Sequence, residues 1–209
     1  MPISSFMGKV TDSETAGSVS PQILGKGISS QHLVDFVRSR FGDEAWLAVY
    51  GDLKPESREV FSRPLLASAW YPYVAYADLL GIVVQRFFGG NIERASEVGA
   101  HDLEKSLNTV YRMLYKAGSP AFLVRMSSLL WRSYFNVGRM VVEESGRGFA
   151  RVRIEDFTPP LEAVCWDIFG SICRGLELSG ASDVKATHTE CPLKGGAVMR
   201  YEATWSEEA

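Results

Sequence analysis

The stretch from Phe149 to Trp205 constrains the fold of this chain more than any other part of the sequence. Apolar residues alternate with charged or polar ones in three short segments of it, as in strands that bury one face. Between these segments, apolar residues recur at helical spacing from Leu161 to Leu176, which predicts an amphipathic helix. Pro159-Pro160 precede this helix, and Ser179-Gly180 follow it as a stop signal. The stretch therefore predicts the order strand, helix, strand, strand.

A further strand is predicted just before this stretch. Residues 137–144 lead into Ser145-Gly146-Arg147-Gly148, whose glycines suit a hairpin turn. Four antiparallel strands with one apolar face, packed on one amphipathic helix, make the simplest assembly. We therefore predict an α+β fold in which residues 134–205 form a ββαββ unit, covered by a helical N-terminal half.

The helical half is predicted to span residues 27–133. Ser29 or Ser30 can cap its first helix, because a serine hydroxyl accepts a hydrogen bond from a free N–H group of the first turn. Apolar spacing predicts a later helix from Leu103 to Leu114. Ser119-Pro120 marks the start of the last helix, with proline at the first helical position.

Composition bounds the organisation of the chain. With 209 residues, 46% of them hydrophobic, the chain can bury one substantial core. Residues 1–26 are rich in Ser, Gly and Thr, and we predict a flexible arm there, although Ile23 and Leu24 would allow it to dock. Residues 27–209 are predicted to form a single domain.

Charge and cysteine content exclude several classes of protein. A net charge of −3 argues against nucleic-acid binding, which needs a basic face. No apolar run approaches the roughly 20 residues of a membrane span, and no signal peptide is evident. The three cysteines include no close pair, so a disulfide framework is not expected. We expect a cytoplasmic protein.

Candidates for catalysis are few. The chain has three histidines, His32, His101 and His188, and none forms a motif with serine or cysteine, although a nucleophile needs a nearby base. Gly89-Gly90 and Gly195-Gly196 lack the lysine and the strand-to-helix context of a phosphate loop. We therefore predict that the protein is not an enzyme.

Two segments carry a family resemblance. The chain reads SPAFLVRMSSLLWRSYFNVGRMVVEESGRGFARVRI from Ser119, and ELSGASDVKATHTECPLKGGAVMRYEATW follows the amphipathic helix. In this order and spacing it resembles the 4-vinyl-reductase-like domains and the related haem-NO-binding domains, a superfamily that includes the TRAPP vesicle-tethering subunits. The resemblance implies a stand-alone bacterial sensory or signalling module that binds a small apolar ligand or lipid, contacts a signalling partner and signals through dimer contacts.

The resemblance also raises zinc and haem. A zinc site of the family type would use Cys173, His188, Glu190 and Cys191, but Met199 stands at an expected ligand position and is a poor zinc ligand. For haem, His101 stands in the region expected for the proximal ligand, but the Tyr-x-Ser-x-Arg motif for the propionates is absent. From these departures we predict no cofactor and no metal.

Two functions of different classes remain. The first is a ligand-binding sensor whose pocket lies between helices and sheet, since aromatic and methionine side chains line apolar pockets. The second is an adaptor that binds protein partners without a small molecule, in which case the same side chains are core. The candidate lining residues are Trp70, Tyr73, Tyr76, Phe122, Met126, Trp131, Phe169 and Met199.

The segment from Trp70 to Phe88 bears on oligomeric state. It is apolar on nearly every side and is predicted to form a helix that begins after Tyr71-Pro72. A helix that is apolar all round must be buried on all sides. Relatives in the superfamily commonly pair, so we predict a homodimer in which two such helices meet. Complete coverage by the other N-terminal helices is the alternative.

Overall fold

The computed structural model describes residues 22–106 and 119–207. The elements of the helical half are β1 (Leu24–Lys26), α1 (Gly27–Phe41), α2 (Asp43–Asp52), α3 (Pro55–Phe61), β2 (Trp70–Pro72), α4 (Tyr73–Phe87), η1 (Ile92–Ala95), α5 (Ser96–Ser106) and α7 (Pro120–Tyr134). The elements of the C-terminal unit are β3 (Arg139–Gly146), β4 (Phe149–Glu155), α8 (Glu162–Leu178), β5 (Ala181–Glu190), η2 (Pro192–Lys194) and β6 (Met199–Glu207). Most of the helix predicted from Leu103 to Leu114 lies outside the described residues.

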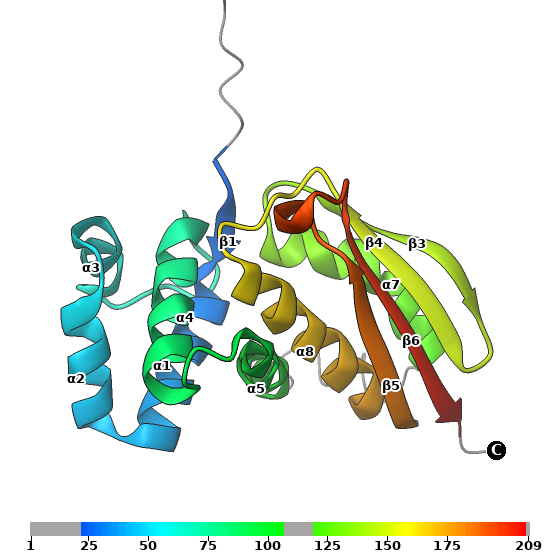
Figure 1. Ribbon diagram of the computed structural model, residues 1–209, viewed down its shortest axis with the longest axis horizontal. Helices are drawn as coiled ribbons and strands as arrows, with labels where there is room; N and C mark the ends of the chain where they lie inside the picture. The colour runs from blue at the N-terminus through cyan, green and yellow to red at the C-terminus, as the bar shows by residue number, and fades with distance from the viewer. Residues whose placement is uncertain (1–21, 107–118, 208–209) are drawn as a thin grey trace, which may run out of the picture.

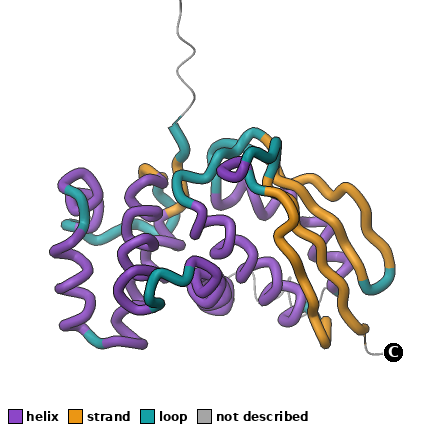
Figure 2. Tube along the Cα trace, in the orientation of Figure 1, coloured by secondary structure: helices purple, strands orange, loops and turns teal. Residues whose placement is uncertain are grey.

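The predicted α+β fold is confirmed. Four antiparallel strands form a sheet in the order β3-β4-β6-β5, and α8 connects its two hairpins. Figure 1 shows α1 to α4 grouped at one end of the molecule, the sheet at the other, and α8 running between them. α7 packs on β3 and α8 on β5, so both helices cover the sheet (Figure 2).

The sheet has the two faces that the alternation predicts. Val152 and Ile154 of β4 and Tyr201 of β6 are buried on the inner face. The outer face carries ion pairs, in which the Glu143 carboxylate accepts hydrogen bonds from the guanidinium groups of Arg153 and Arg200. One apolar and one charged face fix the register of the strands, because a shift by one residue would exchange them.

The start of α1 differs from the prediction. The helix begins at Gly27, and neither Ser29 nor Ser30 caps it. Instead, the backbone N–H groups of Gly27 and Ile28 donate to the carbonyl oxygens of Ala69 and Ala67. A neighbouring loop thus satisfies the free donors of the first turn, and no capping side chain is needed. Ser119 does cap α7 as predicted, accepting a hydrogen bond from the Phe122 N–H.

A small second sheet ties down the end of the predicted arm. β1 pairs antiparallel with β2, and the Leu24 N–H donates to the Asn136 side chain at 2.7 Å. Residues 24–26 therefore belong to the folded domain, which begins before residue 27, while residues 1–21 lie outside the described part of the chain. The sequence does not predict β1 or β2, because three-residue strands show no periodicity.

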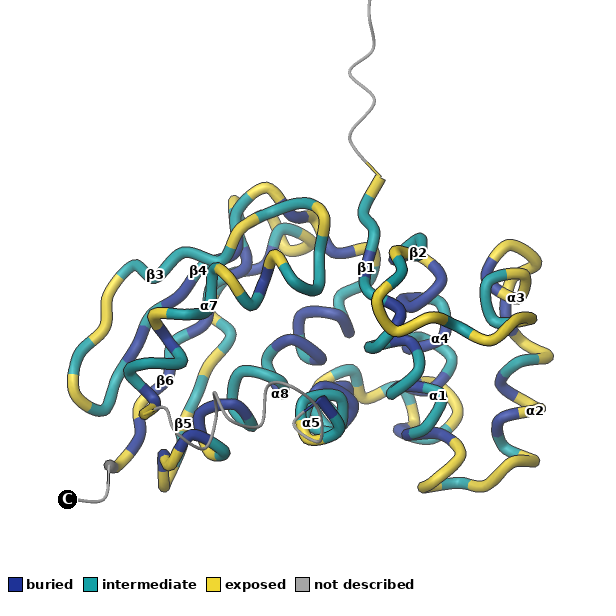
Figure 3. The backbone as a smooth tube through the Cα atoms, turned by 180° about the vertical axis from the view of Figure 1, so that it is seen from behind, coloured by how far each residue is buried: buried dark blue, intermediate teal, exposed yellow. Residues whose placement is uncertain are grey.

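α4 is central, as predicted, but its own chain covers it. Leu79, Leu80 and Val83 are fully buried against the other helices and α8. Val74, with 51% of its surface exposed, and Trp70 of β2, with 39%, remain at the surface. Figure 3 shows buried residues concentrated along α4 and α8 and exposed ones on α2 and α3. Most of α4 is therefore buried within one chain, but Val74 leaves part of it exposed, and pairing with a second copy stays a prediction.

The described part of the chain contains no helix that is both long enough and apolar enough to cross a membrane.

Candidate functional site

A cavity of about 180 Å³ lies between α7, α8 and the inner face of the sheet, with α4 and α5 at one end. It separates two groups of core residues, one centred on α4 and α8 and a smaller one around Val124, Leu176 and Ala203. Close packing normally leaves few voids larger than a water molecule. A partly open hollow of this size against the core is therefore a candidate ligand site.

Half of the candidate lining residues lie at the cavity wall: Tyr73, Tyr76, Trp131 and Phe169. The Trp131 indole N–H donates to the Val137 carbonyl oxygen at 3.0 Å, which fixes the ring on the wall.

The other four candidates lie elsewhere. Trp70 is exposed, with the Lys26 ammonium group 3.9 Å above its ring. Phe122 and Met126 are half-buried on α7 but lie off the wall. Met199 is fully buried, and its sulfur lies 3.5 Å from the Cys165 sulfur. Aromatic and methionine composition alone does not distinguish a cavity wall from solid core or surface.

The candidate residues chosen from the sequence include none of the acidic side chains of the wall, of which Asp167 on α8 is the most buried. Asp167 is 6% exposed, and the Tyr76 hydroxyl donates to its Oδ2 at 2.9 Å. Its Oδ1 has no hydrogen-bond partner among the described residues. Burial, and then the nearby charge of Asp102, raise the pKa of the Asp167 carboxyl well above its usual value. The environment thus favours the protonated acid.

Asp102 reaches the wall from α5. Its Oδ1 lies 2.6 Å from the His32 Nδ1, and both side chains are largely buried. His101, on the same helix, places its Nε2 3.1 Å from a carboxylate oxygen of Asp35. Two of the three histidines therefore pair with carboxylates, and both pairs link α1 to α5.

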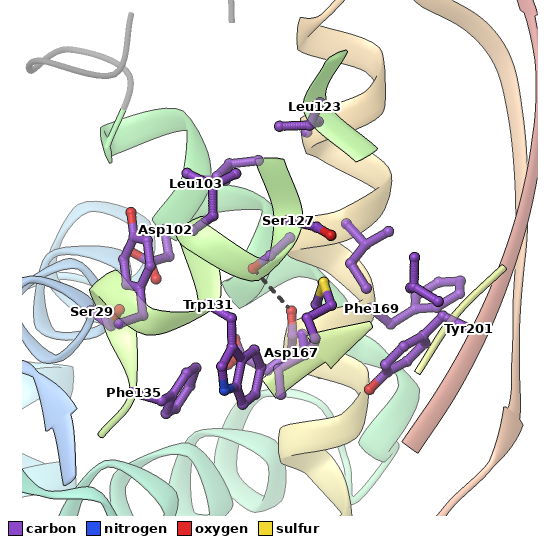
Figure 4. A pocket seen from close by; sticks show the side chains of 18 of the residues that line it. Ser29, Asp102, Leu103, Leu123, Ser127, Trp131, Phe135, Asp167, Phe169 and Tyr201 are labelled. Atoms are coloured by element: carbon purple, nitrogen blue, oxygen red, sulfur yellow. Dashed lines mark hydrogen bonds between the residues drawn. The ribbon is translucent and has the colours of Figure 1, made fainter. Parts of the chain in front are cut away.

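Ser127 of α7 supplies a second polar group at the wall. Its Oγ is buried and has no hydrogen-bond partner among the described residues. Figure 4 shows Ser127, Trp131, Asp167 and Tyr201 gathered around the same space. Buried polar atoms without partners are uncommon in folded proteins and call for an explanation. Here two of them share one cavity.

A second cluster lies where α8 meets the end of β5. Cys165, His188 and Cys191 place one potential ligand atom each within 4.8 Å of one another, and the two cysteine sulfurs are 3.4 Å apart. His188 Nε2 is buried without a hydrogen-bond partner in the described structure. Burial lowers the pKa of His188 and raises that of the Cys165 thiol.

This cluster differs from the zinc set considered from the sequence. Cys173 lies outside it, and Cys165 takes its place. The Glu190 carboxylate is used elsewhere: it accepts a hydrogen bond from the Ala197 N–H and pairs with Arg200. The helical stripe contains both Cys165 and Cys173, so spacing alone could not decide which of them faces β5.

Comparison with known proteins places the fold. No protein-family model matches the sequence, and no curated protein matches it. Solved H-NOX structures do match the fold. An H-NOX protein from S. oneidensis in the Fe(II) state matches with a TM-score of 0.69 and 14% identity, over 88% of this chain and 97% of that one.

Two further H-NOX structures agree. The Fe(II) unliganded H-NOX protein from K. algicida gives a TM-score of 0.67 at 13% identity, over 88% of this chain and 97% of that one. The S. oneidensis protein in the Fe(II)NO state gives a TM-score of 0.67 at 13% identity, over 87% and 99% of the two chains. These matches confirm the haem-NO-binding-like fold, while a relation to 4-vinyl-reductase or TRAPP proteins is not shown.

The comparisons also correct one prediction. We predicted no cofactor, because the propionate motif is absent and Met199 is a poor ligand. Solved structures that share this fold include H-NOX proteins in Fe(II) and Fe(II)NO ligation states. Departures from two sequence motifs were insufficient grounds for excluding a cofactor from this fold, and the prediction is wrong.

Proposed function

We propose that this chain is a non-catalytic sensory module that binds its ligand in the cavity between α7, α8 and the sheet. The observation that carries the proposal is the cavity itself, which divides the core and holds the unpartnered oxygens of Asp167 and Ser127. The likeness to H-NOX proteins over most of the chain supports it. Binding would join the two core groups and so stabilise the packing of α7 against α8.

Haem is the cofactor that the fold implies, and its fit depends on the wall. Haem iron is held in proteins by His, Cys, Met or Tyr side chains. All three histidines lie in the described residues, and none is part of the described wall. Of these ligand types, the described wall holds only methionine and tyrosine, at Met140 and at tyrosines such as Tyr73. The described wall therefore does not fit a histidine-ligated haem.

The charges of the wall agree with this conclusion. Lys26 is the only basic residue of the described wall, and its ammonium group donates to the Ser68 carbonyl oxygen and lies over Trp70. The Asp102 carboxylate would oppose the negative propionates.

The test is ligand uptake by the purified chain. Benzene should shift the NMR resonances of the wall residues Ala150, Val152 and Ala203, because an apolar cavity of about this size can take up benzene. Ser127→Leu should abolish the shifts by filling the cavity, whereas Ser128→Leu, one residue along α7 and off the wall, should keep them. A haemin titration followed by absorption tests the cofactor in parallel.

The opposite result is equally clear. If haemin does not bind and benzene changes the spectrum of the unmodified protein no more than that of Ser127→Leu, the cavity takes up no ligand. The chain would then be an adaptor that works through its surface. The proposal also includes signalling through a homodimer, so sedimentation velocity with and without benzene should show whether occupancy changes the association.

The cluster of Cys165, His188 and Cys191 favours a second candidate function, the binding of a soft metal ion such as zinc. Two thiols and an unpartnered imidazole nitrogen are the ligand types that zinc prefers. Titration with Co²⁺ should give thiolate charge-transfer absorption that Cys191→Ala removes. Cys173→Ala, on the same helix as Cys165 but outside the cluster, should leave the absorption unchanged. Absence of absorption in the unmodified protein would exclude the metal.

A further inference from the structure

Asp167 carries a hydrogen-bonding atom that the fold leaves unused. Asp167 is 6% exposed, and one of its carboxyl oxygens accepts a hydrogen bond from the Tyr76 hydroxyl. The other carboxyl oxygen has no hydrogen-bond partner among the described residues. Leaving a buried polar atom without a hydrogen-bond partner is unfavourable. A ligand with a hydrogen-bond donor at this point would remove that cost.

The charges around Asp167 indicate which donor fits. Among the described residues, the titratable groups that interact with it are Tyr73 and Tyr76 from α4, Asp102 from α5 and Tyr201 from β6. None of these is a cation. The Lys26 ammonium group is held by Ser68 and Trp70. A positive ligand would be attracted to the Asp102 carboxylate and would stabilise the ionised form of Asp167, whereas a negative ligand would be repelled.

The rest of the wall limits size and shape. Trp131, Phe135 and Phe169 present aromatic rings to the cavity, and such rings attract both apolar groups and cations. The volume of about 180 Å³ holds a group of roughly the size of benzene with a short polar extension. Ser127 Oγ offers a second acceptor.

We propose that the cavity binds a small protonated amine with an apolar body, its ammonium group hydrogen-bonded to Oδ1 of Asp167 and its body packed among Trp131, Phe135 and Phe169. The inference rests on the proposed function, because it assumes that the cavity takes up a ligand. Charge-assisted hydrogen bonds are roughly twice as strong as neutral ones, so the amine should be preferred over a neutral analogue of the same shape.

Binding should also move a proton. The free site favours the protonated acid at Asp167, whereas an ammonium group beside it favours the carboxylate. The carboxyl proton is therefore released to solvent as the ion pair forms. Affinity for the amine should rise with pH for as long as the amine itself stays protonated.

The experiment compares benzylamine, benzyl alcohol and benzoate, which share one ring but differ in charge. Calorimetry on the full chain should show benzylamine binding at least about tenfold more tightly than benzyl alcohol, and benzoate most weakly. Asp167→Asn should remove the preference for benzylamine and keep the binding of benzyl alcohol. Asp183→Asn, an exposed site on β5 with the same charge change, should leave all three affinities unchanged.

The outcomes separate this inference from the proposed function. Equal affinities for benzylamine and benzyl alcohol in the unmodified protein would overturn the amine while leaving the cavity as a ligand site. No binding of the three probes, of benzene or of haemin would overturn both. If Asp167→Asn fails to fold, calorimetry of the unmodified protein in buffers of different ionisation enthalpy decides. Proton release on benzylamine binding supports the inference, and its absence contradicts it.

Discussion

Gly99 of α5 lies directly against the backbone carbonyl oxygen of Asp167 on α8, where a β-carbon would overlap that oxygen. Gly170 makes the reciprocal contact with the Ser96 carbonyl oxygen. The two glycines let the helices approach closely, and the Ser171 hydroxyl donates to the Gly99 carbonyl oxygen across the same contact. This contact brings Asp102 on α5 and Asp167 on α8 to one cavity wall.

Gly99→Ala should therefore destabilise the protein. The added methyl group meets backbone, which cannot rotate away, and overpacking of this kind costs about 1–3 kcal/mol. Urea unfolding measures the effect. Gly51→Ala, in α2 with open space at its β-carbon, should instead stabilise by about 0.4–1 kcal/mol. Equal stability of the two variants would contradict the close contact.

Asp167 should make stability depend on pH. Its pKa is raised in the folded state, so the folded protein retains a proton that the unfolded chain loses above about pH 4. The free energy of unfolding should then fall as pH rises from about 4 toward the folded-state pKa. In Asp167→Asn this fall should be smaller, which urea unfolding across a pH series would show.

The control for this prediction is Asp183→Asn. Its carboxyl is exposed, and the variant should keep the pH dependence of the unmodified protein. The assignment to Asp167 would fail if both variants showed the same slope as the unmodified protein between about pH 4 and neutrality.

The fold could be predicted where sequence pattern and burial coincide. The stripe from Leu161 to Leu176 gives α8 because one face of that helix packs on the sheet and the other elements. The start of α1 could not be predicted, because its donors are satisfied by carbonyl groups 39 to 42 residues away, at Ala67 and Ala69. Such a partner has no signature in the local sequence.

The site was harder to predict from the sequence than the fold. Tyr73, Tyr76, Trp131 and Phe169 could be chosen as large side chains on apolar faces. Asp167 gave a weaker signal, an acidic residue on a helix otherwise rich in apolar and small side chains. Its pairing with Asp102 depends on how α5 crosses α8, which the sequence does not show.

Replacing the histidines should not change the absorption spectrum that a haemin titration produces. None of the three histidines is part of the described wall, so any Soret band that forms should keep its position in His32→Ala and His101→Ala. His188→Ala, next to the cysteines of the other cluster, serves as the distant control. Loss of the band in His32→Ala would show that this side chain turns from Asp102 to the iron.

The last prediction concerns the homodimer. Val83 is fully buried within one chain, so Val83→Glu should prevent folding whether or not the protein dimerises, because an unpaired buried charge is strongly unfavourable.

Val74, half exposed on the same helix, is the informative position. Val74→Glu should remain folded by circular dichroism. If two α4 helices meet at this surface, it should also weaken association in sedimentation velocity, because two like charges would face each other across the two-fold axis. Ala48→Glu, at an exposed position on α2, is the control outside α4 and should leave association unchanged. A dimer that both variants leave intact would place the contact elsewhere, and a monomeric unmodified protein at tens of micromolar would refute the homodimer.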